Sequence, residues 1–140
     1  MQEILRLVHH YLAFVTLILL AVATFNGFSG TSGEKMWEDK HRKTNLFTLI
    51  ATHTMLLLGI VLAVMALSNV DMGAIMKSAE ARKAYVEHPT VGIIAAVLVT
   101  IGNAKSKKEI VNGKKFKATM IFFGLALVLV LSRLPFEKLF

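Results

Sequence analysis

The sequence predicts an all-α integral membrane protein folded as a four-helix bundle. Two observations lead to this prediction. Of the 140 residues, 55% are hydrophobic, and they gather in four long segments instead of recurring at the spacing of a soluble core. The polar stretches between these segments hold most of the charged side chains. We expect residues 1–140 to form a single domain of four transmembrane helices.

Four segments qualify as membrane spans, because about 20 apolar residues in a helix cross a hydrocarbon core about 30 Å thick. The first, residues 7–28, has no charged side chain and exceeds the length of a secretory signal's apolar region, so we expect a retained helix. The other three spans are residues 46–68, 89–104 and 118–134. The third span, residues 89–104, is the shortest, and Pro89 suits the first position of its helix.

Polar stretches at residues 26–43, 69–87 and 105–117 are predicted as loops. The first contains Gly27 and Gly30, which are typical of turns. The first and third of these loops together hold ten of the 16 lysines and arginines. Since cytoplasmic loops are enriched in these residues, we expect both basic loops to be cytoplasmic and both termini to lie on the outer, periplasmic side.

The composition excludes several classes of function. Cysteine is absent, which excludes disulfides, thiolate catalysis and iron–sulfur ligation. The chain has no P-loop, no HExxH motif and no nucleophile elbow, so hydrolytic chemistry is not indicated. The net charge of +7 is explained by membrane topology and contact with anionic lipids, and nucleic acid is not an expected partner.

Histidines are the most informative residues, because an ionisable side chain inside a membrane span costs free energy and usually has a function. Helix rise places His9 and His88 in the outer half of the bundle and His53 nearer the middle. His10 lies about 100° around the helix from His9, so we expect it at the interface. His41 is expected outside the membrane and solvated.

Two imidazoles on separate helices suit haem b, whose iron takes one axial nitrogen from each helix. We expect His9 and His88 to be the axial ligands, with His53 as the alternative partner. Arg6 and Arg133 lie at the outer level, where a guanidinium would pair with the haem propionates.

Simpler interpretations of the same residues remain open. Gly92-x-x-x-Ala96 is a small-residue pattern of membrane helix packing as well as a space for a flat ring. His53 can form a hydrogen bond to a neighbouring helix, and His88 can cap its helix at the interface. The two arginines can reach lipid headgroups without contacting a ligand.

Several short segments follow one another in a characteristic order and spacing. They are ILR at residues 4–6 with His9, HRK at 41–43 with LFTLIATH at 46–53 and Gly59, VEH at 86–88, VTIG at 99–102, and residues 121–136. In these features the chain resembles a family of small bacterial four-helix membrane proteins labelled cytochrome B. The resemblance implies a bundle in a bacterial inner membrane and points to His9, His53 and His88. The chain departs from the family pattern where an arginine usually follows the first histidine, and in having Phe136 where a tryptophan is usual.

These observations predict a b-type haem-binding membrane cytochrome that transfers electrons in a respiratory or quinone-linked chain, without a substrate of its own. The expected partners are the lipid bilayer and larger respiratory membrane subunits or quinone. The alternative is a non-redox accessory membrane subunit whose histidines are structural. A third hypothesis is a zinc or iron site formed by His9, His88 and Glu87.

Overall fold

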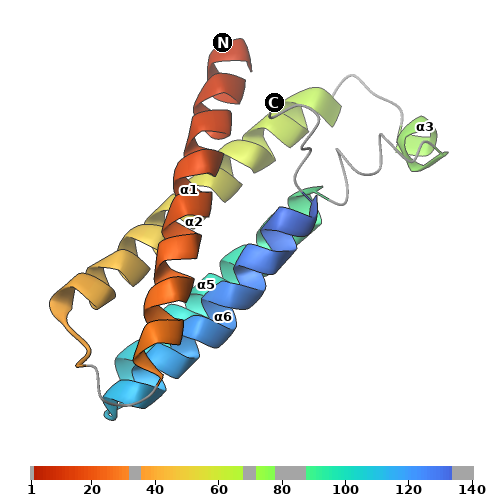
Figure 1. Ribbon diagram of the computed structural model, residues 1–140. Coiled ribbons are helices and arrows are strands. Elements are labelled where there is room, and N and C mark those ends of the chain that lie inside the picture. The colour runs from red at the N-terminus through yellow and green to blue at the C-terminus, as the bar shows by residue number, and fades with distance from the viewer. Residues whose placement is uncertain (1, 32–35, 68–71, 78–87, 134–140) are drawn as a thin grey trace.

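The structure is a computed structural model that describes residues 2–31, 36–67, 72–77 and 88–133, and this part of the chain is helical apart from short connections. The described residues form four long helices and one short one, which Figure 1 labels. In chain order they are α1 (Gln2–Gly30), α2 (Asp39–Leu67), α3 (Met72–Lys77), α5 (His88–Lys108) and α6 (Asn112–Arg133).

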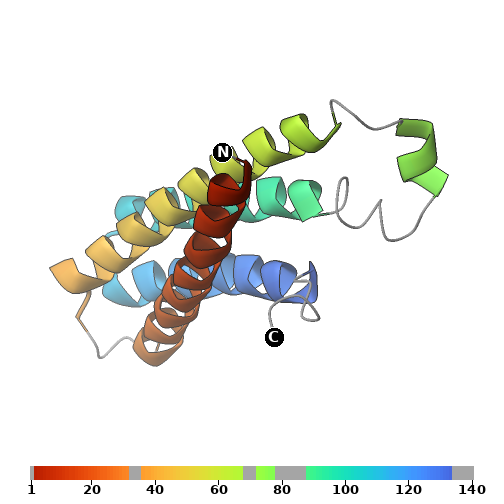
Figure 2. The ribbon, with the colours of Figure 1, turned by 90° about the horizontal axis from the view of Figure 1, so that it is seen from above.

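The long helices form a ring in which each packs mainly against two neighbours, in the order α1, α2, α5, α6 and back to α1. Successive long helices run in opposite directions, as Figures 1 and 2 show. Therefore α1 and α5 begin at one end of the bundle, which we call the N-terminal end. At the opposite end α1 and α5 finish, and α2 and α6 begin.

All four long helices are long and apolar enough to cross a membrane. Within the most apolar window of each helix, only 17% to 33% of the residues are buried, so most apolar side chains face outward. Such a surface suits lipid, since a soluble monomer rarely exposes large continuous apolar patches. The predicted all-α, four-helix membrane architecture is confirmed at this level.

The bundle core is built from small and aromatic side chains. It brings together one small residue from α1, one from α5 and one from α6 with larger side chains that fill the space between them. The buried members are Leu20, Ala23, Ala95, Val99, Phe123 and Ala126. Small residues let membrane helices approach closely, which replaces the hydrophobic driving force that is missing in lipid.

Two glycines that suggested a turn lie instead on a buried face of α1, so the predicted loop 26–43 is too long. A Cβ added at Gly27 would lie 2.5 Å from the backbone nitrogen of Met120, and one at Gly30 would overlap the Phe116 ring. The glycines are therefore contact points with α6. Because they pack rather than turn, α1 continues to Gly30 and α2 already begins at Asp39.

The predicted loop 105–117 is also mostly helical. α5 runs to Lys108 and α6 begins at Asn112, which leaves only residues 109–111 as the connection. Lysine is a good helix former, and Ser106 and Phe116 are buried, so packing extends both helices. In the predicted loop 69–87, α3 occupies Met72–Lys77 and most other positions lie outside the described residues.

A buried polar cluster connects three helices near the opposite end. The Asn45 side-chain amide of α2 donates a hydrogen bond to Thr119 Oγ1 of α6 at 3.0 Å and lies 3.4 Å from Ser106 Oγ of α5. Lys115 Nζ donates to the Ser106 carbonyl at 2.7 Å. Hydrogen bonds between membrane helices contribute about 0.6 kcal/mol each on average, so the cluster fixes the helix register more than it adds stability.

His41 is 2% exposed, so the expectation that it is solvated is wrong. The Glu38 N–H donates to His41 Nδ1 at 2.9 Å, and the Glu38 carbonyl accepts from the Arg42 N–H at 3.3 Å. The imidazole thus takes the place of the glutamate in a capping box at the start of α2. Its ring also packs against Trp37 and Phe116, with centroids 5.4 and 4.9 Å away.

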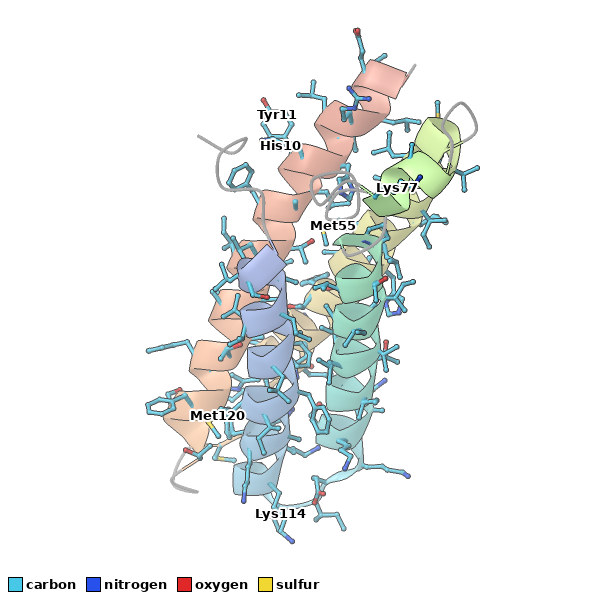
Figure 3. All side chains as sticks on the ribbon, turned by 90° about the vertical axis from the view of Figure 1, so that its right-hand side faces the viewer. His10, Tyr11, Met55, Lys77, Lys114 and Met120 are labelled. Atoms are coloured by element: carbon cyan, nitrogen blue, oxygen red, sulfur yellow. The ribbon has the colours of Figure 1, made fainter. Side chains whose placement is uncertain are left out.

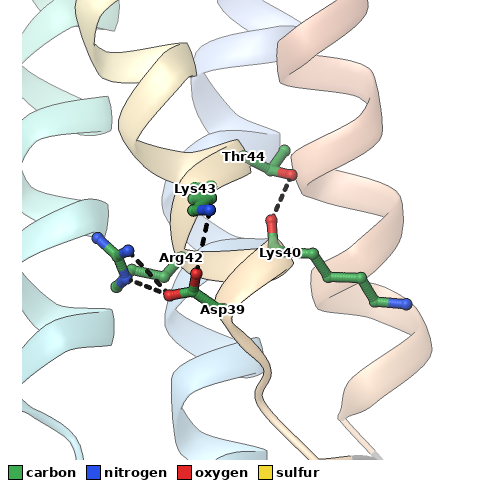
Figure 4. A network of polar contacts seen from close by, with 5 residues as sticks. All are labelled: Asp39, Lys40, Arg42, Lys43 and Thr44. Atoms are coloured by element: carbon green, nitrogen blue, oxygen red, sulfur yellow. Dashed lines mark hydrogen bonds and ion pairs between the residues drawn. The ribbon is translucent and has the colours of Figure 1, made fainter.

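The exposed side of the same turn carries a small ionic network (Figure 4). Asp39 contacts Arg42 Nη2 at 2.8 Å and Lys43 Nζ at 3.3 Å. These pairs are solvent-exposed and therefore contribute little stability. Their acidic partner lies in the first turn of α2, where negative charge suits the helix dipole.

We predict that Gly27→Ala destabilises the bundle by on the order of 3 kcal/mol, because the new methyl group meets α6 backbone that cannot rotate away. The measurement is thermal unfolding in detergent. Gly124→Ala is the matched control, since its Cβ would lie 3.4 Å from Thr24 Cγ2, an ordinary contact. Both changes bring the same gain in helix propensity, so equal melting temperatures would contradict the close α1–α6 contact.

Candidate functional site

A pocket opens between the helices toward the N-terminal end of the bundle. Its cavity volume is about 70 Å³, and the pocket is partly open to the outside. Side chains from all four long helices contribute to its wall, which makes it a feature of the bundle and not of one helix pair. The lining residues are His9, Ala13, Met55, Leu56, Gly59, Ile60, Pro89, Val91, Gly92 and Val130.

Among the described residues of this wall, His9 is the one polar side chain. It is half-buried on α1, with its Nδ1 atom shielded from solvent. The ring faces α2 at Gly59, where an added Cβ would lie 3.2 Å from His9 Cε1. That distance is shorter than most contacts of a Cβ atom, so glycine at position 59 gives the imidazole its room.

The rest of the wall is apolar and partly small-sided. Gly92 of α5 faces Leu56 of α2 across the pocket, and a Cβ there would lie an ordinary 3.6 Å from Leu56 Cδ1. Ala13 follows His9 by one helical turn and adds no bulk. In Figure 3, Met55 lies between α1 and α5. The described wall thus combines one imidazole with apolar side chains, which is typical of small-molecule sites.

The predicted site residues are brought together only in part. Pro89, directly after His88, lines the pocket, so α5 begins beside it, but the side chains of His88 and Arg133 lie outside those described. Arg6 is exposed on α1, one turn before His9. His10 packs against Phe14 with ring centroids 5.1 Å apart, and Figure 3 shows it with Tyr11 on the outward side of α1.

His53 occupies a different place from His9. It is exposed on the outward side of α2, where its Nδ1 lies 2.8 Å from the Leu49 carbonyl and its Nε2 lies 3.2 Å from Thr100 Oγ1 of α5. It lines a second, shallower hollow. Leu56 is the side chain that the two hollows share.

Sequence reasoning missed the α2 side of the pocket. Gly59 was noted only at the end of a segment that resembles the cytochrome B family. Met55 and Ile60 were interpreted as ordinary residues of the second membrane span. The spacing contained a signal, because Met55 with Gly59 and Leu56 with Ile60 are two adjacent i, i+4 pairs. Without the pairing of α1 with α2, nothing indicated that this face meets His9.

Carboxylates do not join His9 in the described ranges. No group of three His, Cys, Asp or Glu residues there is arranged to hold a metal ion. Glu87, which the zinc or iron hypothesis requires, lies outside the described residues.

Comparison with known proteins gives no further identification. No family model, curated protein or solved structure matches this chain. The resemblance to the cytochrome B family therefore stays a prediction from the sequence, and functional inference has to come from the pocket itself.

We predict that Gly59→Ala shifts the His9 ring by a few tenths of an ångström, because the new methyl group would press on Cε1. The His9 Cε1–Hε1 NMR resonance of the protein in detergent micelles should move. Gly92→Ala is the control within the same pocket, since its Cβ would make only an ordinary contact. If both variants left the resonance unchanged, the contact of Gly59 with His9 would be refuted.

Proposed function

We propose that the protein is a b-type membrane cytochrome that binds haem b in the pocket beside His9 and carries single electrons within the membrane. The observation that supports this most directly is the position of His9 in the wall of an otherwise apolar hollow, beside a glycine that leaves room for its ring. Imidazole is a common axial ligand of haem iron.

The chemistry of the wall fits such a group. Haem is a flat macrocycle with an apolar body, and the pocket has apolar walls with small residues on α1, α2 and α5. His9 would supply one axial nitrogen. The start of α5 beside the pocket makes His88 the proposed second ligand, and His53 is the alternative through a change of register between helices.

When bound, haem would supply a one-electron redox centre, and the chain would tune it. The apolar walls would lower the local dielectric and keep water from a bound iron, which would affect its reduction potential. Gly59 leaves room for the imidazole and takes no part in the chemistry. Arg6 and Arg133 are the proposed partners of the propionates, because both lie in the helical turns nearest the N-terminal end.

We further propose that the N-terminal end faces the periplasm of a bacterial inner membrane. Support comes from the lysines at the opposite end, where α5 finishes with Lys105, Lys107 and Lys108. Such enrichment is typical of cytoplasmic ends. The haem would then lie in the outer half of the membrane, where a quinone or a larger respiratory subunit can exchange electrons with it.

We predict that the protein, expressed in a haem-replete host and purified in detergent, has a Soret band and a reduced-minus-oxidised difference spectrum of the b type. His9→Ala should lose most of the Soret absorbance, because an axial nitrogen is removed. The measurement is the ratio of Soret absorbance to protein concentration.

His10→Ala is the matched control. It removes a neighbouring imidazole that packs on Phe14 outside the pocket, so the Soret band should persist. A wild-type protein without a Soret band would refute the cytochrome proposal and would favour the accessory subunit with structural histidines. Equal absorbance in the His9 and His10 variants would refute the role of His9 as a haem ligand.

A further inference from the structure

A second hollow lies on the outward surface between α2 and α5. Its cavity volume is about 230 Å³, and it is more open than the pocket beside His9. Its wall is apolar except for two polar side chains, one from each helix. The lining residues are His53, Leu56, Ile93, Ala96, Val97, Thr100 and Ile101. We call this hollow the His53 groove.

The groove presents its polar pair inside the membrane span. The first turn of α2, from Asp39 to Lys43, is charged and exposed, so the apolar span begins near Leu46. His53 follows Leu46 by seven residues, and the helix rise therefore places it about 10 Å inside the hydrocarbon. His53 and Thr100 are both exposed there, although polar side chains in a membrane normally face the bundle interior. A polar pair that faces lipid at this depth is expected to form a hydrogen bond to a molecule dissolved in the membrane.

Hydrogen bonding determines what kind of partner is needed. The Leu49 carbonyl can only accept, so His53 Nδ1 carries the proton and, in the neutral ring, Nε2 is an acceptor. Thr100 Oγ1 has a single proton, and it lies 2.7 Å from the Ala96 carbonyl and 3.2 Å from His53 Nε2. When that proton serves Ala96, Nε2 needs another donor. The groove therefore suits a guest that brings a hydroxyl group.

The shape of the groove suits an aromatic ring. Ile93, Val97 and Ile101 recur every four residues along one exposed face of α5 and form an apolar side wall. Ala96, which is buried, leaves depth between this face and α2 because its side chain is a single methyl group. A flat ring can lie against the wall with its edge toward His53.

We propose that the His53 groove binds the ring of a lipid-soluble quinol, with one quinol hydroxyl donating a hydrogen bond to His53 Nε2. Depth selects this class of ligand. Phospholipids and sterols keep their hydroxyl and phosphate groups at the membrane surface, whereas a quinol has a polar ring that can enter the hydrocarbon interior. Binding to this groove does not depend on haem, and the quinol would extend the proposed cytochrome function by supplying a source of electrons.

The test uses the full chain in phosphatidylcholine nanodiscs and a short-chain benzoquinol under anaerobic conditions. Bound quinol is measured by equilibrium partition against empty nanodiscs. We expect saturable binding that becomes about tenfold weaker in His53→Phe, which corresponds to the loss of one good hydrogen bond. Thr100→Val should bind as well as the wild type or better, because it removes the internal competitor for Nε2.

Two further measurements locate the ligand. The dimethyl ether of the same benzoquinol has no hydroxyl donor, so it should bind at least as weakly to the wild type as the quinol binds to His53→Phe. Val97→Phe would fill the groove from an exposed position and should abolish saturable binding without unfolding the bundle. Thr54→Val is the control on α2, since this exposed hydroxyl donates only to the Ile50 carbonyl.

The proposal is overturned if His53→Phe and Val97→Phe, both shown to be folded by circular dichroism, bind quinol like the wild type. It is also overturned if quinol binding to the wild type is not saturable. If the same two variants then dissociate a dimer, the groove belongs to a second copy of the chain. Soret absorbance in the same samples tests the haem independently, so either proposal can fail while the other stands.

Discussion

The bundle depends on the close approach of α1 and α6, which is possible only because Gly27 has no side chain where the Met120 backbone passes. In lipid there is no hydrophobic gain from bringing apolar helices together, so contact at backbone distance has to supply the attraction. Gly30 extends this contact to the Phe116 ring, and Phe116 in turn packs against the histidine that caps α2. One helix contact thereby fixes the end of the bundle where α1 and α5 finish.

The four spans and their polar ends could be predicted from the sequence, because hydropathy over about 20 residues reports the membrane requirement directly. The helix ends could not. Glycine is common both in turns and on the packing faces of membrane helices, so Gly27 and Gly30 could not distinguish the two in the sequence. The lysines after Asn103 are likewise compatible with both helix and loop. The burial of His41 could not be predicted either, because Phe116, which packs against its ring, comes from α6.

The candidate site shows the same division. His9 and His53 could be singled out from the cost of an imidazole in lipid, but only the helix pairing shows that they serve different hollows. His9 faces inward toward Gly59, whereas His53 faces outward beside Thr100. Helical spacing gives the face on which a residue lies, and it gives no information on which neighbour covers that face. The pocket wall on α2 therefore required the structure.

Leu56 lines both hollows, so they share one side chain. A guest that turned this side chain in one hollow would change the space available in the other. Thermodynamic linkage then requires that each occupant alter the affinity of its counterpart by an identical factor. Two ligands in these hollows would therefore be coupled through one side chain, without any movement of the backbone.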